Sequence, residues 1–262
     1  MLHREKSMRW LLSLLMLYVG YLPAKQPPLL RVALLDSWAM PLAQFENNYP
    51  VEGALPDLMN SLASQLGMRA DFHVLPRLRL QSAMERGTID VRCFVIPTWA
   101  NDPSNQYTWS PPLFQQRDWL VAHEKPSTPV NLASLPRQTI GTVLGFYYPA
   151  LQPQFDSGYF DRDDARNQLQ VLQKLQARRN LYAVSSQWSL DWFNSQLPPE
   201  QRLHPLVMLE EQALGCMVRN DPAVPTQAIL RTLARMKQSG EIERAFARYT
   251  QPATAPLMGH NP

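Results

Sequence analysis

The sequence predicts an α/β protein built from two similar lobes. Residues 70–75 alternate between apolar and polar side chains, as a half-buried strand does. Pro76 then ends this strand and favours a helix over 77–86, which Gly87 closes. An apolar run over 89–96 is typical of a buried parallel strand. The stretch is therefore one strand, helix, strand unit, around which the rest of the chain is organised.

The same spacing recurs about ninety residues later in the chain. Three residues of the first unit align without a gap on identical residues of a second unit: Leu80, Gln81 and Arg86 on Leu172, Gln173 and Arg178. A helix that leads into a strand at equal spacing in both halves favours two α/β lobes over one continuous sheet. Chance similarity between two short amphipathic helices is the alternative interpretation.

Length and composition fit a globular protein with one large core or two modest ones. The chain has 262 residues, of which 45% are hydrophobic and 18% are charged. It contains 24 prolines against 10 glycines. This ratio indicates stiff loops and many helix starts, which suit an α/β fold better than an all-β fold.

Residues 1–24 are expected to form a secretory signal peptide. Three basic residues precede the apolar segment 10–22, and Ala24 offers a cleavage site. Leu22 is a mediocre residue at the third position before the cut, so an uncleaved membrane anchor is the alternative. Export would place the mature protein in the periplasm. Without the signal, 22 Lys and Arg face 21 Asp and Glu, a balance that argues against a nucleic-acid partner.

No pattern in the sequence indicates a metal site or a cofactor. The five histidines are scattered, and they form neither an H-E-x-x-H motif nor a cluster with cysteine. The two cysteines, Cys93 and Cys216, would lie in an oxidising compartment either as one disulfide or as two buried thiols. Motifs of nucleophilic enzymes such as G-x-S-x-G and S-x-x-K are also absent.

Apolar periodicity predicts the remaining elements. Strands are expected at 30–35, 118–123, 138–143, 181–185, 206–209 and 214–218, and helices at 55–66, 166–179, 186–194, 228–236 and 241–249. The proline-rich, aromatic segment 97–112 is expected to be a loop that leads to a crossover between the lobes, and 251–262 a loose tail. Trp188 and Trp192 lie one helical turn apart, which favours core packing over ligand contact.

Several segments, taken in their order, resemble the family 3 extracellular solute-binding proteins, the periplasmic receptors of amino-acid-type ABC importers. They are VALLD, GALPDLMNSLASQLG, PRLRLQSAMERGTID, NLASLPRQTIGTVLG, and MVRNDP followed by LARMKQSGEIERAFARY. Each segment alone is a loose match, but their order and spacing extend over nearly all of the mature chain. The resemblance implies a two-lobed, periplasmic-binding-protein-like fold of type II with a ligand cleft between the lobes.

The same resemblance implies the domain organisation and the function. After the signal peptide, a discontinuous domain one would span 27–114 plus 212–262, with domain two inserted at 115–211. Members of this family use no catalytic residues. Ligand binding closes the lobes, and the closed form docks on an ABC transporter permease in the inner membrane. The protein is therefore expected to be a monomeric periplasmic receptor for a small polar or aromatic solute, and not an enzyme.

Two alternatives to a transport receptor remain open on the sequence. A few proteins with this fold are dehydratases, and an acid or base for such chemistry would be sought at Glu46, Glu52 or Asp102. The other alternative is a receptor that presents its closed form to a membrane sensor instead of a transporter. Measured turnover would identify the enzyme, and neighbouring genes would separate the two kinds of receptor.

Two charged anchors that the family resemblance implies are missing from the expected positions. Family members hold the ligand carboxylate with an arginine a few residues after a threonine, but here Thr98 is followed by Trp99 and no arginine. They hold the ammonium with an aspartate after a strand of lobe two, where this chain has Ser186 and Gln187. A standard α-amino acid is therefore not the expected ligand.

Other residues at the predicted strand ends could replace these anchors. Aromatic side chains there could stack on a flat ligand, and Arg79 matches a P-x-x-R variant of the family motif, with a structural arginine as the alternative. Arg77 is expected to be solvated. The predicted ligand-binding residues are Asp36, Trp38, Arg79, Thr98, Trp99, Gly145, Phe146, Tyr147, Ser186 and Gln187.

The resemblance also favours the disulfide over two free thiols. In this family the strand that returns from domain two runs antiparallel beside the third strand of domain one. Cys93 and Cys216 would then face each other across the two strands. On this basis we expect a bond between them, with two buried thiols as the alternative.

Overall fold

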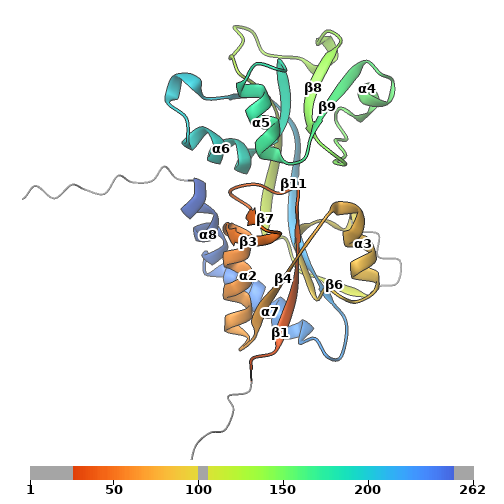
Figure 1. The fold of residues 1–262 in the computed structure, drawn as a ribbon, viewed down its shortest axis with the longest axis vertical. Coiled ribbons are helices and arrows are strands. Elements are labelled where there is room, and N and C mark those ends of the chain that lie inside the picture. Colours follow the sequence, from red (N-terminus) through yellow and green to blue (C-terminus); the bar gives the residue numbers. More distant parts are fainter. Residues whose placement is uncertain (1–25, 100–105, 251–262) are drawn as a thin grey trace, which may run out of the picture.

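Two lobes follow one another along the long axis of the molecule, and a pair of long strands joins them (Figure 1). The computed structural model describes residues 26–99 and 106–250. The predicted signal peptide at 1–24 and the predicted tail at 251–262 lie outside the described residues. Among the described helices, none is long and apolar enough to cross a bilayer.

Lobe one is built on a mixed sheet. The strands of lobe one are β1 (Leu29–Leu35), β2 (Gln44–Glu46), β3 (Tyr49–Glu52), β4 (Arg69–Leu75), β5 (Val91–Val95), β6 (Tyr107–Trp109) and the C-terminal part of β11 (His204–Arg219). The strand order is β4, β1, β5, β11, with β6 beside β11 and with β2 and β3 in a separate hairpin. β1 pairs in parallel with β4 and β5, whereas β11 runs antiparallel to β5.

In the described part of the chain, lobe one also contains the α-helices α2 (Ala54–Gln65), α3 (Arg77–Glu85), α7 (Thr226–Gln238) and α8 (Glu241–Thr250). α2, α7 and α8 contact one another on one side of the sheet, while α3 lies on the other side against β1 (Figure 1). The predicted apolar stripe of α2, which includes Leu55, Leu58 and Leu62, is buried. One hydrophobic core therefore serves the whole lobe.

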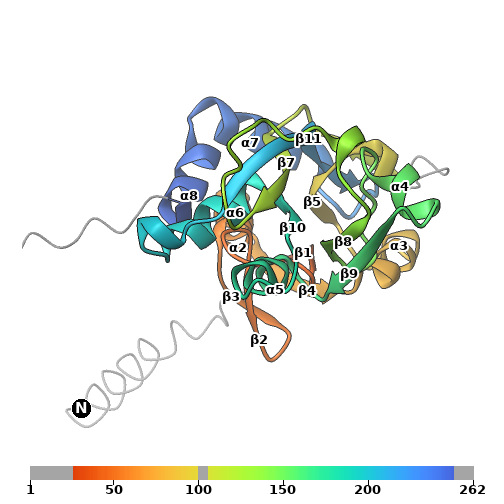
Figure 2. The same cartoon turned by 90° about the horizontal axis from the view of Figure 1, so that it is seen from above.

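Lobe two is a second sheet with helices on both faces. It contains β7 (Phe114–Ala122), β8 (Gln138–Val143), β9 (Phe160–Ala165), β10 (Tyr182–Ser186) and the N-terminal part of β11, with α4 (Gln152–Asp156), α5 (Gln168–Gln176) and α6 (Gln187–Ser195). α5 and α6 cover one face and α4 the other (Figure 2). Neighbouring residues such as Leu120 and Val121 point into different cores, as the period of a strand requires.

The connection between the lobes is a two-stranded ribbon, which we call the hinge ribbon. β7 and β11 pair antiparallel from Phe114 opposite Leu214 to Ala122 opposite His204, with two register shifts near the His204 end. The predicted strands at 206–209 and 214–218 are in fact one strand, β11. The predicted domain boundaries fall inside this ribbon, and the exact division of the chain stays a prediction.

Cys93 of β5 and Cys216 of β11 are joined by a disulfide. They are directly opposite each other in the antiparallel pair, and both are buried in the core of lobe one. This confirms the predicted disulfide and the predicted neighbourhood of the two strands. The bond fixes the end of the hinge ribbon to the sheet of lobe one.

Several short or charged elements were not predicted. β9 carries four consecutive charged residues, from Asp161 to Asp164, and therefore has no apolar pattern to identify it as a strand. It forms the edge of the lobe-two sheet, where charged side chains can reach solvent. β6 lies within the segment 97–112, which was expected to be a loop throughout. β7 begins at Phe114, four residues earlier than its apolar run indicates.

Candidate functional site

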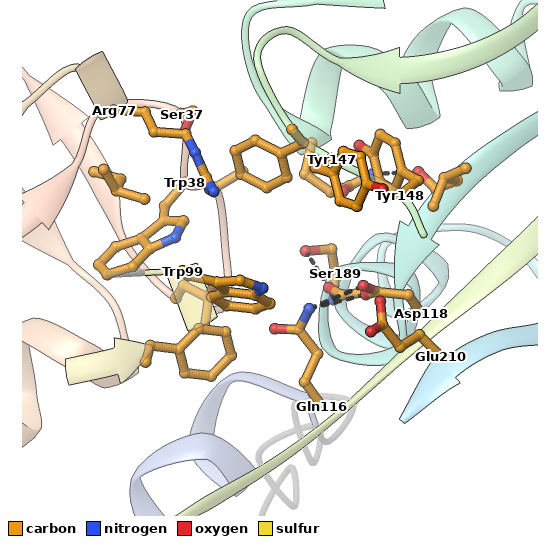
Figure 3. Close-up of a pocket in the computed structure, with 18 of the residues that line it drawn as sticks. Ser37, Trp38, Arg77, Trp99, Gln116, Asp118, Tyr147, Tyr148, Ser189 and Glu210 are labelled. Carbon is orange, nitrogen blue, oxygen red and sulfur yellow. Dashed lines mark hydrogen bonds between the residues drawn. The ribbon is translucent and has the colours of Figure 1, made fainter. Parts of the chain in front are cut away.

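A cavity lies where the two lobes meet the hinge ribbon (Figure 3). It holds about 860 Å³ of empty space, part of which is open to solvent. Lobe one, the ribbon and lobe two all contribute to its wall. The side chains that matter below are Trp38, Arg77, Arg92, Phe94 and Trp99 from lobe one, Gln116, Asp118 and Glu210 from the ribbon, and Phe146, Tyr147, Tyr148, Ser186 and Ser189 from lobe two.

The structure brings together half of the residues that the sequence indicates for the site. Trp38, Trp99, Phe146, Tyr147 and Ser186 line the cavity. The others do not line it: Asp36, Arg79, Thr98 and Gly145 are exposed, and Gln187 donates a hydrogen bond to Asp191. Ligand contact by these five residues stays a prediction from the sequence, and the position of Arg79 outside the cavity wall argues against such contact by Arg79.

The aromatic wall on the side of lobe one depends on an irregularity in β5. Phe94 has a φ of 61°, which a bulky residue rarely adopts, and it lies beside a register shift between Gly215 and Cys216. Such bulges turn a side chain away from its regular direction. The Phe94 ring lines the cavity and meets Trp38 edge-on, with centroids 6.1 Å apart.

Arg92 is the most unusual residue of the site. It is only 5% exposed, on the central strand β5, and it lines the cavity. Within the described part of the chain, its guanidinium has neither a hydrogen bond nor an ion pair. Burial, with a smaller effect of the nearby Arg77 charge, lowers the pKa of Arg92 to about 10. The site therefore contains a buried cation without a protein counterion in the described residues.

Arg77 adds a second positive charge from the first turn of α3. Its guanidinium lies 5.4 Å from the centroid of the Phe146 ring, so a lobe-one cation contacts a lobe-two aromatic residue across the cleft. Burial lowers the pKa of Arg77. The expectation that Arg77 is solvated is therefore wrong. The helix turns Arg77 toward the cleft and leaves Arg79, two residues on, exposed.

Two carboxylates of the hinge ribbon face the same cavity. Asp118 of β7 is opposite Glu210 of β11, and Gln116 donates hydrogen bonds of 2.9 and 3.2 Å to Asp118. Gln212 donates one to Glu210. Burial raises the pKa of Asp118 to about 6, and the Glu210 charge adds to this effect. Among the described residues, no cation pairs with either carboxylate.

Lobe two fixes its part of the wall through buried polar contacts. The Tyr148 hydroxyl accepts a 3.0 Å hydrogen bond from the Val143 backbone N–H, and this holds the loop that carries Phe146 and Tyr147. The Ser186 hydroxyl caps α6 by accepting from the Ser189 backbone N–H. Tyr147 remains 64% exposed although it lines the cavity. It is thus free to contact a ligand or the opposite lobe.

An open cavity between two lobes that share paired strands is an architecture found in proteins that bind small solutes. The chain belongs to the bacterial extracellular solute-binding proteins, family 3, whose sequence profile matches residues 30–252. This confirms the family resemblance drawn from the sequence. No curated protein sequence matches the chain.

Solved structures show the same fold. An ancestral arginine-binding protein bound to arginine is 19% identical, with 87% of this chain and 100% of that chain covered and a TM-score of 0.66. The ancestral amino acid-binding protein AncCDT-1, a precursor of cyclohexadienyl dehydratase, is 15% identical, with 85% and 96% covered and a TM-score of 0.67. A histidine kinase sensor domain with similarity to periplasmic binding proteins is 19% identical, with 86% and 96% covered and a TM-score of 0.65.

Proposed function

We propose that the protein is a receptor that captures a small polar or aromatic solute in the cleft and closes around it. The observation that carries this proposal is Arg92. A buried, unpaired guanidinium costs on the order of several kcal/mol, and a bound anion would offset that cost. A protein that keeps such a charge at the wall of a cavity gains most when an anionic ligand enters.

Closure would follow from contact with both lobes at once. A ligand against Arg92 and Trp99 touches lobe one, and the same ligand can reach Tyr147 and Ser186 of lobe two. Such a ligand binds the closed state more tightly than the open state, so it shifts the population toward closure. The hinge ribbon is the element that would deform.

We assign the receptor to the periplasm, as a monomer that delivers its ligand to an ABC importer permease in the inner membrane. Support comes from the family, which comprises extracellular solute-binding proteins. Presentation to a membrane sensor is the second receptor role, since one solved relative is a histidine kinase sensor domain. Co-purification with the permease encoded beside the gene supports the importer, and co-purification with a sensor kinase contradicts it.

A thermal-shift screen over metabolites, followed by calorimetry, tests the capture of a solute. A ligand present at 100 times its Kd should stabilise the protein by about 2.7 kcal/mol. Arg92→Met should abolish the shift, whereas Arg79→Met, a matched change of an exposed arginine, should leave it intact. X-ray scattering should show a smaller radius of gyration with ligand. A screen without any stabilising solute, or binding that Arg92→Met leaves unchanged, contradicts the proposal.

Asp118 supports one enzymatic alternative. A carboxyl group whose pKa lies near 6 inside a cavity can act as a general acid or base, and one solved relative is a precursor of a dehydratase. The carboxylates expected from the sequence are less suitable, because Glu46 and Glu52 are exposed on the β2–β3 hairpin and Asp102 lies outside the described residues. Turnover of a stabilising ligand that Asp118→Asn abolishes would establish the enzyme.

A further inference from the structure

The charged groups of the cavity are divided into two pairs of opposite sign. Arg77 and Arg92 belong to lobe one, while Asp118 and Glu210 belong to the hinge ribbon. Within each pair the two like charges repel each other. The Arg77 charge lowers the pKa of Arg92, and the Glu210 charge raises the pKa of Asp118. The cavity thus has a cationic side and an anionic side.

The two pairs do not neutralise each other. Within the described residues, no ion pair joins either arginine to Asp118 or Glu210, and neither carboxylate raises the pKa of either arginine. Figure 3 shows Arg77 and the Asp118–Glu210 pair on opposite sides of the cavity. Arg77 is therefore separated from the two carboxylates by the cavity, and neither arginine is neutralised by them.

Aromatic side chains occupy the walls between the two sides. In Figure 3, Trp38 and Trp99 lie below Arg77 at one end of the space, and Tyr147 lies across it. Flat, apolar walls favour a flat, apolar body that can stack on them. The anionic and cationic ends of such a body would each reach one pair of charges.

We propose that the ligand class is a flat organic zwitterion whose carboxylate and amine are at opposite ends of the molecule. This inference rests on the proposed receptor function and names its ligand. Arg77 and Arg92 bind the carboxylate, Asp118 and Glu210 bind the protonated amine, and the tryptophans contact the body between them.

An α-amino acid fits this arrangement poorly. Its ammonium and carboxylate share one carbon, so a carboxylate bound at Arg92 brings the ammonium beside two guanidinium groups. Like charges at that distance repel, and the ammonium is then too far from Asp118 to be compensated. The division of charges thus gives a physical reason for the ligand preference that the missing family anchors indicate.

Two isomeric probes test the proposal without any mutation. 4-(Aminomethyl)benzoate and phenylglycine contain the same atoms and the same charges, but only the first separates the charges across a ring. Calorimetry at pH 7.5 on the purified protein should give 4-(aminomethyl)benzoate a Kd at least about tenfold lower than either enantiomer of phenylglycine. Equal or tighter binding of phenylglycine overturns the proposal.

Variants then locate each end of the probe. Arg92→Met should weaken 4-methylbenzoate, which has only the acid, and leave benzylamine unchanged. Asp118→Asn should weaken benzylamine, which has only the amine, and leave 4-methylbenzoate unchanged. If Arg92→Met does not fold, as judged by circular dichroism, Arg77→Met on the surface helix α3 takes its place. Equal loss of both single-charge probes in each variant overturns the assignment of the two ends.

The metabolite screen keeps this inference separate from the receptor function. If 4-(aminomethyl)benzoate does not bind while a metabolite stabilises the protein and depends on Arg92, the receptor stands and the charge-separated ligand is wrong. If neither the probe nor any metabolite binds, both are wrong.

Discussion

Trp188 of lobe two is in contact with Phe246 of lobe one, with ring centroids 4.5 Å apart. The Trp188 indole N–H also donates a 3.1 Å hydrogen bond to the Gln115 carbonyl of the hinge ribbon. Phe246 stacks in turn on Phe94, which lines the cavity. A continuous series of aromatic contacts therefore links the wall of the site to a junction between the lobes.

Replacing Trp188 by alanine should loosen this junction. We expect the free energy of unfolding to fall by about 1–3 kcal/mol, because an aromatic contact and part of a buried surface are lost. Scattering should also show a larger radius of gyration for the ligand-free protein. Trp192→Ala is the matched control, since among the described residues Trp192 packs against the core of lobe two. Equal expansion in both variants would argue against an inter-lobe role for Trp188.

Asp118 should make stability depend on pH. Its pKa is raised to about 6 in the folded protein, so folding favours the protonated form, and stability falls as pH rises from about 4 to above 6. The charged group that acts on it is Glu210 of β11, and the Asp118 charge in turn raises the pKa of Tyr148 of lobe two. Asp118→Asn should therefore stabilise the protein at pH 8 by at most about 3 kcal/mol and have no such effect near pH 4.

Urea unfolding at both pH values measures this effect. Asp161→Asn, at an exposed position on β9, is the matched control and should show no pH-dependent gain. A gain for Asp118→Asn that is the same at pH 4 and pH 8 would contradict the prediction, because it would not arise from ionisation.

Asp90 should be essential for the stability of lobe one. Its buried carboxylate accepts a 3.0 Å hydrogen bond from the Arg31 Nε atom and lies 3.3 Å from Arg219, so it joins β1 to β11. Asp90→Asn removes the counterion of Arg31 and one of the two carboxylates that pair with Arg219, the other being Asp221, and should cost about 3 kcal/mol of unfolding free energy. Glu124→Gln removes an exposed ion pair with Arg178 and should change nothing measurable. A small effect of Asp90→Asn in denaturant unfolding would refute this role.

Arg77 and Arg79 should differ sharply in binding although they lie on the same turn of α3. Arg77→Met should weaken 4-(aminomethyl)benzoate about tenfold, since a charge-assisted contact to the carboxylate is lost. Arg79→Met should leave the Kd unchanged, because Arg79 is exposed and outside the cavity wall. Calorimetry decides between the two positions, and a larger loss for Arg79→Met would restore the assignment made from the P-x-x-R motif.

Most of the fold could be predicted because helices such as α2 and strands such as β4 carry an apolar period in the sequence. The strand β9 and the middle of β11 could not, since their side chains face solvent or the cavity and carry no apolar pattern. The arrangement of the chain into two lobes was predicted from the resemblance to the known family. Local apolar periodicity carries no information about that arrangement.

Some residues of the site could likewise be predicted from the sequence, and others could not. The aromatic residues Trp38 and Tyr147 follow predicted strands, where ligand sites of α/β proteins are found, and so could be chosen from the sequence. Arg92 and Asp118 lie inside strands, and their approach to the cavity depends on which strands become neighbours. One local signal was available: an arginine within the apolar run at 91–95 must be buried, and a buried charge needs a partner.

The disulfide between Cys93 and Cys216 closes a covalent ring over a sequence separation of 123 residues. β7, all of lobe two and β11 as far as Cys216 lie on this ring. A protease that cuts one exposed segment of it, such as 124–129, therefore releases no fragment. Both new ends remain attached to the centre of the lobe-one sheet, and a second cut on the ring is needed before any piece of lobe two can leave the molecule.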